Sequence, residues 1–333
     1  MPNTVARAAR SRICLLLPLL WVLHSCSHQS RESKSTALIA KDRRPVTHLP
    51  AESVGWTEVI NNLVAVFDDV DVVALGETHG RKMDSDLRLR LIRAPAFALR
   101  VRWIVMESAN SLYQPILDRY TRGDDVPPSV LAQVWRNIIV VRGADSKVYK
   151  EFFATVRDVN RLLPSDRRLH VVAGDPPVDW KQVHVRSDIE PFLERRAFPV
   201  SLGETAVRKG EKALVIYGSA HVARPQFPLW AAGIQTQPPW AQAPLPTGTP
   251  PFVRAIEVSG PDRVFTVHSC PRAEPGRVLL QLSVSPDSPG SAPQYDACFF
   301  DGEPDADLIV GPDADAEYAT EVARRSRAFQ SSR

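Results

Sequence analysis

The chain has 333 residues, 44% of them hydrophobic, so it can bury the core of one large domain and is not a disordered polypeptide. Lysine and arginine (41) nearly balance aspartate and glutamate (38), which gives a formal net charge of +3. A surface that neutralises nucleic-acid phosphates needs a larger and more concentrated positive charge. These values exclude nucleic acid as the expected partner.

The first residues have the pattern of an export signal. Three arginines precede the apolar run 13–23, which contains a proline and is short for a membrane span. The sequence Leu23-His24-Ser25-Cys26 follows directly and resembles the lipobox of bacterial lipoproteins, with Cys26 as the residue that carries the lipid. We therefore expect a lipoprotein-type signal peptide over 1–25 and a polar tether over 26–52. The protein would be anchored to the membrane in the bacterial cell envelope, facing the periplasm or the exterior.

Four short apolar runs predict the strands of a core at 53–223. They are nearly continuous in Val, Ile, Leu and Ala, which is typical of strands covered on both faces in a mostly parallel sheet. The runs lie at 70–75, 103–107, 169–173 and 213–217. Segments with helical character separate or follow them at 84–93, 111–122, 129–137, 148–163 and 189–208. Strands that alternate with helices predict an α/β fold, with a mostly parallel sheet flanked by helices.

The remainder of the chain does not show this alternation of apolar runs and helical segments. Residues 224–252 are rich in proline and predict a long loop, in which Trp230 and Trp240 either line a lid or pack on the sheet. Alternating patterns at 252–258, 263–268 and 278–284 predict strands of an antiparallel extension within 253–316. The end, 317–333, is polar, and we expect it to be frayed. Cys270 and Cys298 would be bridged in an oxidising compartment, or else they are two separate thiols.

Ionisable residues gather where the predicted strands end. Gly76-Glu77-Thr78-His79 follows the first strand, Glu107 ends the second, Asp175 follows the third, and Gly218-Ser219-Ala220-His221 follows the fourth. Each has a plain alternative: Glu107 as a helix N-terminal acid, Asp175 as a turn former before two prolines, and each histidine as a hydrogen-bonded structural residue. Ligands of open α/β sheets collect at the carboxyl ends of the strands, so together these residues predict one site.

Two histidines with carboxylates support two kinds of chemistry. Glu77, His79 and His221 can bind a divalent metal that activates water. Without a metal, a histidine held by a carboxylate can act as a general base. The spacing does not choose between them. In either case Glu77, His79, Glu107, Asp175 and His221 are the candidate catalytic residues, with Glu107 and Asp175 in supporting positions. The sequence contains neither Gly-x-Ser-x-Gly nor His-Glu-x-x-His, which gives serine-hydrolase and zincin interpretations no support.

These motifs resemble a known superfamily. The two Gly-x-x-His motifs, Glu107, and the run 113–120 followed by Gly123 are similar to the group of erythromycin esterases, Tiki and TraB/PrgY proteins, and ChaN haem-binding lipoproteins. The resemblance implies a hydrolase, with or without a divalent metal, acting on a small-molecule or peptide substrate. The spacing of Glu77 and His79 departs by one residue from that of the macrolide esterases, which argues against that activity.

The ChaN branch implies an alternative function, the binding of haem or iron without catalysis. Tyr113, Tyr120 and His184 are then the candidate haem ligands. Arg81, Arg88, Arg90 and Arg93 either bind an anionic substrate or, as we expect, form a solvated helix face with charged pairs. Trp180, beside Asp179, either lines the site or packs in the fold.

Overall fold

The computed structural model describes residues 46, 48–139, 146–194, 211–223, 263–269, 276–283, 295–303 and 316–331. Every described residue belongs to one compact unit, 43–333. Several predicted features lie outside the described residues and stay predictions. They are the signal peptide, Cys26 and most of the tether, the proline-rich loop with Trp230 and Trp240, the strand at 252–258, and Cys270.

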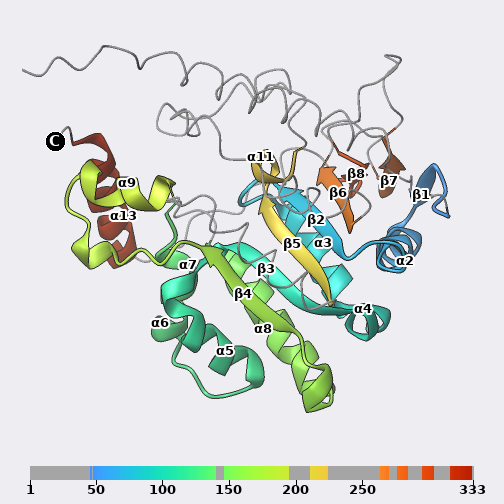
Figure 1. Cartoon of the computed structure of the whole chain (residues 1–333), viewed down its shortest axis with the longest axis horizontal. Coiled ribbons are helices and arrows are strands. Elements are labelled where there is room, and N and C mark those ends of the chain that lie inside the picture. Colours follow the sequence, from blue (N-terminus) through green and yellow to red (C-terminus); the bar gives the residue numbers. More distant parts are fainter. Residues whose placement is uncertain are drawn as a thin grey trace, which may run out of the picture. The chain divides into compact units, whose positions relative to one another are not determined.

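An eight-stranded sheet forms the centre of the described fold (Figure 1). Its order is β1-β7-β8-β6-β2-β5-β3-β4, and the pairs from β8 to β4 are all parallel. The strands are β1 (Glu52–Val54), β2 (Val72–Glu77), β3 (Val101–Asn110), β4 (His170–Asp175), β5 (Lys212–Gly218), β6 (Val264–Ser269), β7 (Leu279–Leu282) and β8 (Ala297–Phe300). The predicted mixed α/β fold with a mostly parallel sheet is confirmed.

Helices follow the strands of the parallel part. They are α2 (Trp56–Val66), α3 (Lys82–Arg93), α4 (Pro95–Arg100), α5 (Gln114–Arg122), α6 (Pro128–Leu131), α7 (Gln133–Arg136), α8 (Ser146–Leu162), α9 (Arg186–Glu194), α11 (Ser219–Val222) and α13 (Ala316–Gln330), with 3₁₀ turns at Ser111–Tyr113, Ser165–Arg167 and Trp180–Gln182. Most of the predicted helices are found here, but 111–122 begins with a 3₁₀ turn and 129–137 is two short helices. For the helix predicted at 189–208, only the part up to Glu194 is described.

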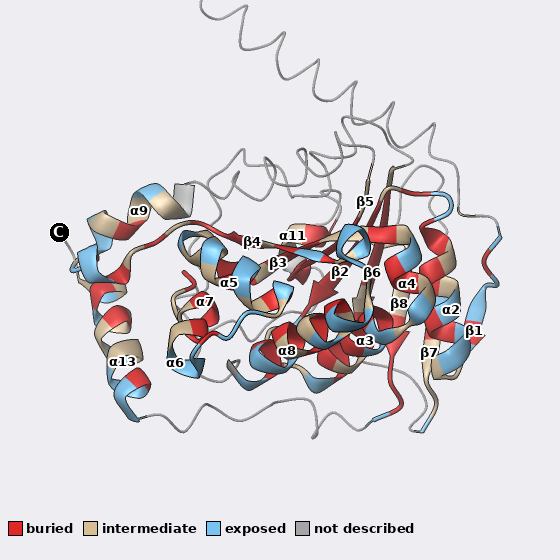
Figure 2. Ribbon diagram, turned by 90° about the horizontal axis from the view of Figure 1, so that it is seen from below, coloured by how far each residue is buried: buried red, intermediate tan, exposed pale blue. Residues whose placement is uncertain are grey.

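The two faces of the sheet carry separate apolar clusters, as the alternation of side chains along a strand requires. On β2, Val73 and Leu75 belong to the large cluster formed with helices α2, α3, α4 and α8, whereas Val72 and Ala74 belong to a smaller cluster on the other face. Figure 2 shows α3 and α8 turning their buried residues toward the sheet. By the same alternation, Glu77 faces α3 and α8.

The antiparallel extension is smaller than the sequence predicts. β7 pairs antiparallel with β8 and with β1, as expected of 278–284. β6, however, runs parallel to both β2 and β8 and extends the parallel part of the sheet. Its alternating pattern indicated a strand but could not show the direction, because direction depends on which neighbour it pairs with. β1 and β8 were not predicted, because both runs are very short.

The chain end is not the frayed tail that its polarity suggested. Residues 316–330 form α13, whose Tyr318, Arg325 and Ala328 are buried. Arg324 donates to the carbonyl oxygens of Trp180 and Val183, at 2.8 Å each. A helix with few apolar residues can thus dock through arginine hydrogen bonds, which a hydropathy pattern does not reveal. No helix in the described ranges is long and apolar enough to cross a membrane.

Candidate functional site

The structure brings together four of the five predicted site residues at the carboxyl edge of three adjacent strands. Glu77 ends β2, His79 lies two residues beyond it, Glu107 lies in β3, and His221 lies in α11 directly after β5. The Glu107 carboxylate lies between the two imidazoles. Its Oε2 is 3.6 Å from His79 Nε2, and its Oε1 is 3.3 Å from His221 Nε2. The cluster is partly open, since 15% of the His79 side chain and 22% of the His221 side chain are exposed.

Glu77 lies behind His79 and is nearly sealed in the helical layer. Its Oε1 is 2.9 Å from His79 Nδ1, and its Oε2 accepts an ion-paired hydrogen bond from Arg88 of α3, itself only 2% exposed. Burial pushes the pKa of Glu77 upward, but the Arg88 charge and the bond with His79 hold it below its ordinary value. The carboxylate is therefore ionised and can only accept, so His79 donates from Nδ1 and a neutral His79 presents an unprotonated Nε2 to Glu107.

Glu107 is also ionised. Burial acts to raise its pKa, but His221, His79 and the backbone N–H of Gly218 outweigh burial and lower the pKa to about 2. A Cβ at 218 would lie 3.1 Å from His79 Nε2 and 3.3 Å from Glu107 Oε2, so a larger residue would push these side chains by a few tenths of an ångström. The glycine of the second Gly-x-x-His motif therefore lets His79 and Glu107 lie close to β5.

Three side chains that complete this cluster were not predicted. Tyr149 of α8 donates to Glu77 Oε1 at 3.1 Å, and Arg88 had been assigned to a solvated face. Asp84 accepts from the Thr78 backbone N–H at 2.8 Å. Asp84 and Arg88 are four residues apart on α3 and flank the buried Leu87, so helical periodicity could have identified both. Tyr149 lies in a separate helix, and no local signal points to it.

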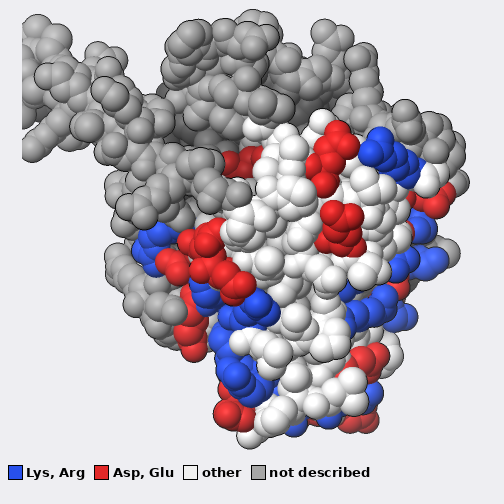
Figure 3. All heavy atoms as spheres, turned by 90° about the vertical axis from the view of Figure 1, so that its right-hand side faces the viewer, with Lys and Arg blue, Asp and Glu red and all other residues white. Residues whose placement is uncertain are grey.

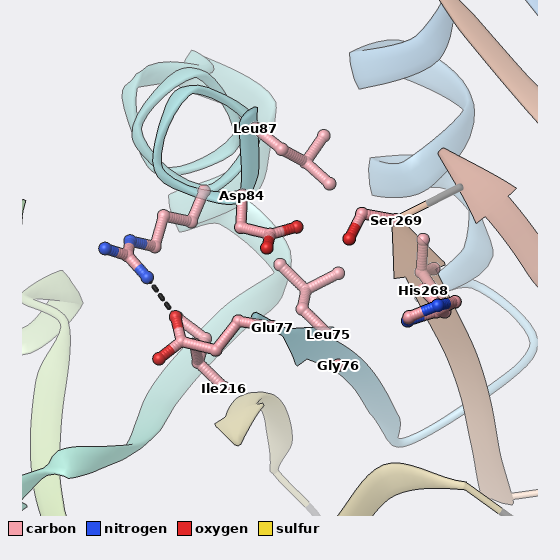
Figure 4. A pocket seen from close by; sticks show the side chains of 10 residues that line it. Leu75, Gly76, Glu77, Asp84, Leu87, Ile216, His268 and Ser269 are labelled. Atoms are coloured by element: carbon pink, nitrogen blue, oxygen red, sulfur yellow. Dashed lines mark hydrogen bonds and ion pairs between the residues drawn. The ribbon is translucent and has the colours of Figure 1, made fainter. Parts of the chain in front are cut away.

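A small cavity of about 10 Å³, roughly the space of one water molecule, lies beside Glu77. Glu77, Asp84, Leu87, His268 and Ser269 are among its lining residues (Figure 4), and the dashed line there marks the ion pair of Glu77 with Arg88. Burial raises the pKa of Asp84 to about 7, the Glu77 charge adds to this, and the Thr78 N–H opposes it.

His268 of β6 forms a second imidazole environment on the other side of β2. Its ring stacks on Tyr295 at 4.6 Å between centroids, and its Nδ1 is 3.1 Å from Ser219 Oγ. The Ser219 hydroxyl donates to the Glu77 carbonyl oxygen at 3.1 Å, so His268 Nδ1 donates to Ser219. Burial and then the charge of Arg81 lower the pKa of His268 to about 4, which keeps the ring neutral.

The predicted metal ligands Glu77, His79 and His221 do not form a common site. Glu77 accepts hydrogen bonds from Arg88, Tyr149 and His79 Nδ1, whereas His221 Nε2 lies against Glu107. Within the described ranges, no group of three or more His, Cys, Asp or Glu side chains is arranged to hold a metal ion. The sequence could not distinguish Glu77 from Glu107, because both are carboxylates at neighbouring strand exits.

Asp175 and Trp180 stabilise the chain near the site rather than lining it. Asp175 accepts from the Ile139 backbone N–H at 2.7 Å, and Trp180, 2% exposed, donates to the carbonyl oxygens of Asn137 and Ile138. Asp179 caps the 3₁₀ turn that begins at Trp180. These contacts hold the segment after α7 against the end of β4. They match the packing interpretation of Trp180.

The haem-ligand candidates lie elsewhere. Tyr113 precedes α5 and Tyr120 is near its end, so their backbones are about 10 Å apart along the helix. The Tyr120 ring also receives the Arg157 guanidinium at 4.6 Å, and His184 is exposed beside α9. Cys298 of β8 is disulfide-bonded, and since Cys270 lies outside the described residues, the pairing of these two stays a prediction.

The solvated face expected for the arginines of α3 is wrong for Arg88. Arg90 is exposed and lies over the Trp56 ring at 4.2 Å, Arg93 donates to Thr155, and Arg81 donates to Ser269. Lys and Arg are interspersed with Asp and Glu on the face shown in Figure 3. Arg88 is set apart from its neighbours because its position on the helix turns it to the sheet, where Glu77 supplies the opposite charge.

The fold and cluster define a mixed α/β protein with a His-Glu-His site at the carboxyl edge of its sheet. No family model and no curated protein sequence matches the chain. Two solved structures are similar. The type III effector HopBA1 gives a TM-score of 0.40 at 12% identity and covers 82% of this chain and 98% of its own. ChaN of Campylobacter jejuni, which binds haem cofacially, gives 0.32 at 10% identity, with 74% and 92% covered. Likeness at this level carries no information about chemistry.

Proposed function

We propose that the chain is a hydrolase that uses its two strand-exit histidines as a general base and a general acid. The observation that carries this proposal is the Glu107 carboxylate between two Nε2 atoms, 3.6 Å from His79 and 3.3 Å from His221. Glu77 and Arg88 neutralise each other, so Glu107 is one negative charge shared by two imidazoles. The cluster has no net charge when one of the two imidazoles is protonated on both ring nitrogens and so carries a positive charge.

The two histidines differ in what they can do. His79 donates Nδ1–H to Glu77, so Nε2 is the ring nitrogen that takes the proton from water. His221 directs Nε2 at Glu107, an ionised acceptor, so Nε2 is the nitrogen from which His221 donates. Water oxygen attacks the carbonyl carbon of an ester, lactone or peptide, and its proton passes to His79. The bond to the leaving group then breaks, and the leaving group takes the proton of His221.

The test is hydrolysis of a panel of chromogenic esters, lactones and peptides by the full chain. His79→Ala and His221→Ala are expected to lower kcat by about 10²-fold or more, because each removes one proton-transfer group. His184→Ala, which removes an exposed imidazole away from the cluster, is the matched control and should retain full activity. Equal activity of all four proteins, or none with any substrate, would refute the proposal.

Chelation separates this mechanism from a metal-dependent one. Because side chains carry both proton transfers, activity is expected to survive dialysis against EDTA. Loss of activity that added Zn²⁺ restores would instead assign a metal to the cluster. The His79→Ala and His221→Ala variants would then also lose bound metal, which elemental analysis of the purified proteins measures.

Haem binding without catalysis is the alternative function. It was predicted from the sequence, and ChaN of Campylobacter jejuni, one of the two similar structures, binds haem. Titration of the chain with haem tests it. A Soret shift that is lost in Tyr113→Phe, Tyr120→Phe or His184→Ala would support this alternative, and the absence of any shift would remove it.

A further inference from the structure

Tyr149 is a buried tyrosine whose hydroxyl reaches the candidate site from a different element than any predicted residue. It lies on α8 and is 1% exposed. Its hydroxyl oxygen is 3.1 Å from Glu77 Oε1 and 3.4 Å from His79 Nδ1. A tyrosine that only filled the core would be expected to direct its hydroxyl to a backbone carbonyl or to water, whereas this one contacts both members of the Glu77–His79 pair.

The direction of the hydrogen bond follows from the charge of Glu77. An ionised carboxylate accepts only, so the Tyr149 O–H donates to Oε1, which also accepts the Nδ1–H of His79. The other oxygen, Oε2, accepts from Arg88. Each carboxylate oxygen is therefore fixed by a donor from a helix, Arg88 from α3 and Tyr149 from α8. Rotation of the carboxylate would break one of these bonds.

The hydrogen bond from Tyr149 to Glu77 has two consequences for His79. A carboxylate that cannot rotate holds the imidazole plane and keeps Nε2 directed at Glu107. In addition, an oxygen that already accepts from a hydroxyl attracts the Nδ1–H less strongly than one that does not. The hydroxyl therefore limits how much Glu77 stabilises the protonated imidazole, while Glu107, 3.6 Å from Nε2, stabilises it from β3 with or without Tyr149.

We infer that Tyr149 is a positioning residue of the proposed hydrolase, which orients His79 through Glu77. This inference rests on the proposed function of the cluster. Tyr149 does not face the substrate side, because it lies on the helical side of Glu77 with the Arg88 guanidinium 5.4 Å from its ring centroid. Its effect should therefore fall on kcat and on pH dependence rather than on substrate affinity.

The test is Tyr149→Phe, which removes the hydroxyl and keeps the ring. With a substrate from the hydrolysis panel, kcat is expected to fall about tenfold with KM unchanged, as for a residue behind a catalytic group. The acid limb of the kcat profile should move to higher pH, because Glu77 then stabilises the imidazolium more strongly. Tyr318→Phe removes another buried hydroxyl, which donates to the Arg136 carbonyl oxygen at 3.3 Å, and should change neither quantity.

An NMR measurement makes the inference independent of activity. The proton on His79 Nδ1, identified by its loss in His79→Ala, should move downfield in Tyr149→Phe, because its acceptor is no longer shared. An unchanged proton resonance would overturn the positioning role even if the enzyme is active. If the wild-type chain hydrolyses nothing, the proposed function fails, yet the same resonance still decides whether Tyr149 controls the Glu77–His79 bond.

Discussion

Two imidazole environments lie on either side of the end of β2, and they differ in the charge of the groups that surround the histidines. His79 and His221 face the ionised Glu107, whereas His268 has an aromatic ring and a hydroxyl as neighbours and is kept neutral by burial and by Arg81. Ser219 and His221 belong to the same Gly-x-x-His motif, but Ser219 contacts His268 and His221 contacts Glu107. A strand-exit histidine away from a carboxylate is thus kept neutral by burial, whereas the other two lie against a negative charge.

Removing the carboxylate should abolish the difference between the two sides. Glu107→Gln is expected to lower kcat by about 10³- to 10⁴-fold, because the acid and the base both lose their shared charge. Its stability should stay near wild type, since the Gln carbonyl can still accept from Gly218. His268→Gln, on the other side of β2, should keep most of the activity. Steady-state kinetics of both variants measures this. A larger loss of kcat in His268→Gln than in Glu107→Gln would show that catalysis was assigned to the wrong side of β2.

Breaking the ion pair of Glu77 with Arg88 should strongly destabilise the fold. Arg88→Met leaves the buried Glu77 charge without its cation and is expected to destabilise the fold by about 3 to 5 kcal/mol. Adding Glu77→Gln removes that charge and should restore part of the loss. Arg90→Met, on the exposed side of the same helix, is the control. Denaturant unfolding measures all three, and equal effects of the two arginine variants would contradict a buried pair.

The neutral His268 should make the free energy of unfolding depend on pH. The pKa of His268 is about 4 in the fold and about 6.5 when unfolded, so the unfolded state takes up the proton first as pH falls. Its contribution to stability is therefore full above pH 6.5 and is lost toward pH 4, by about 3 kcal/mol. Asp84 acts oppositely: its raised pKa makes stability fall as pH rises from about 4 to about 7.

The difference between wild type and His268→Gln, measured by denaturant unfolding at each pH from 4 to 7, isolates the histidine from Asp84. The wild type is expected to lose stability relative to the variant as pH falls. A constant difference across that range would mean that His268 is not held neutral in the fold.

Much of the architecture could be predicted from local pattern. The continuous apolar runs before Gly76 and Gly218 indicated parallel strands, and the polar residues after them fell at one edge of the sheet. The site was harder to predict in detail. From sequence, Glu77 could be the base or the residue that orients His79, with Glu107 in support; in the structure Glu77 lies against His79 Nδ1, and Glu107 lies between the two imidazoles. Sequence cannot show which carboxylate faces inward, because the side-chain alternation that turns Glu77 toward α3 becomes meaningful only once the covering helices are known.

The sequence by itself determined which residue types stand at the strand exits, since short apolar runs and glycines specify strands and turns locally. The tertiary structure alone decided their partners. Arg88 and Tyr149 meet Glu77 across 11 and 72 residues of chain, and Gly218 meets Glu107 across 111. Contacts over such separations depend on how the strands pair and how the helices pack against the sheet, which no local pattern encodes.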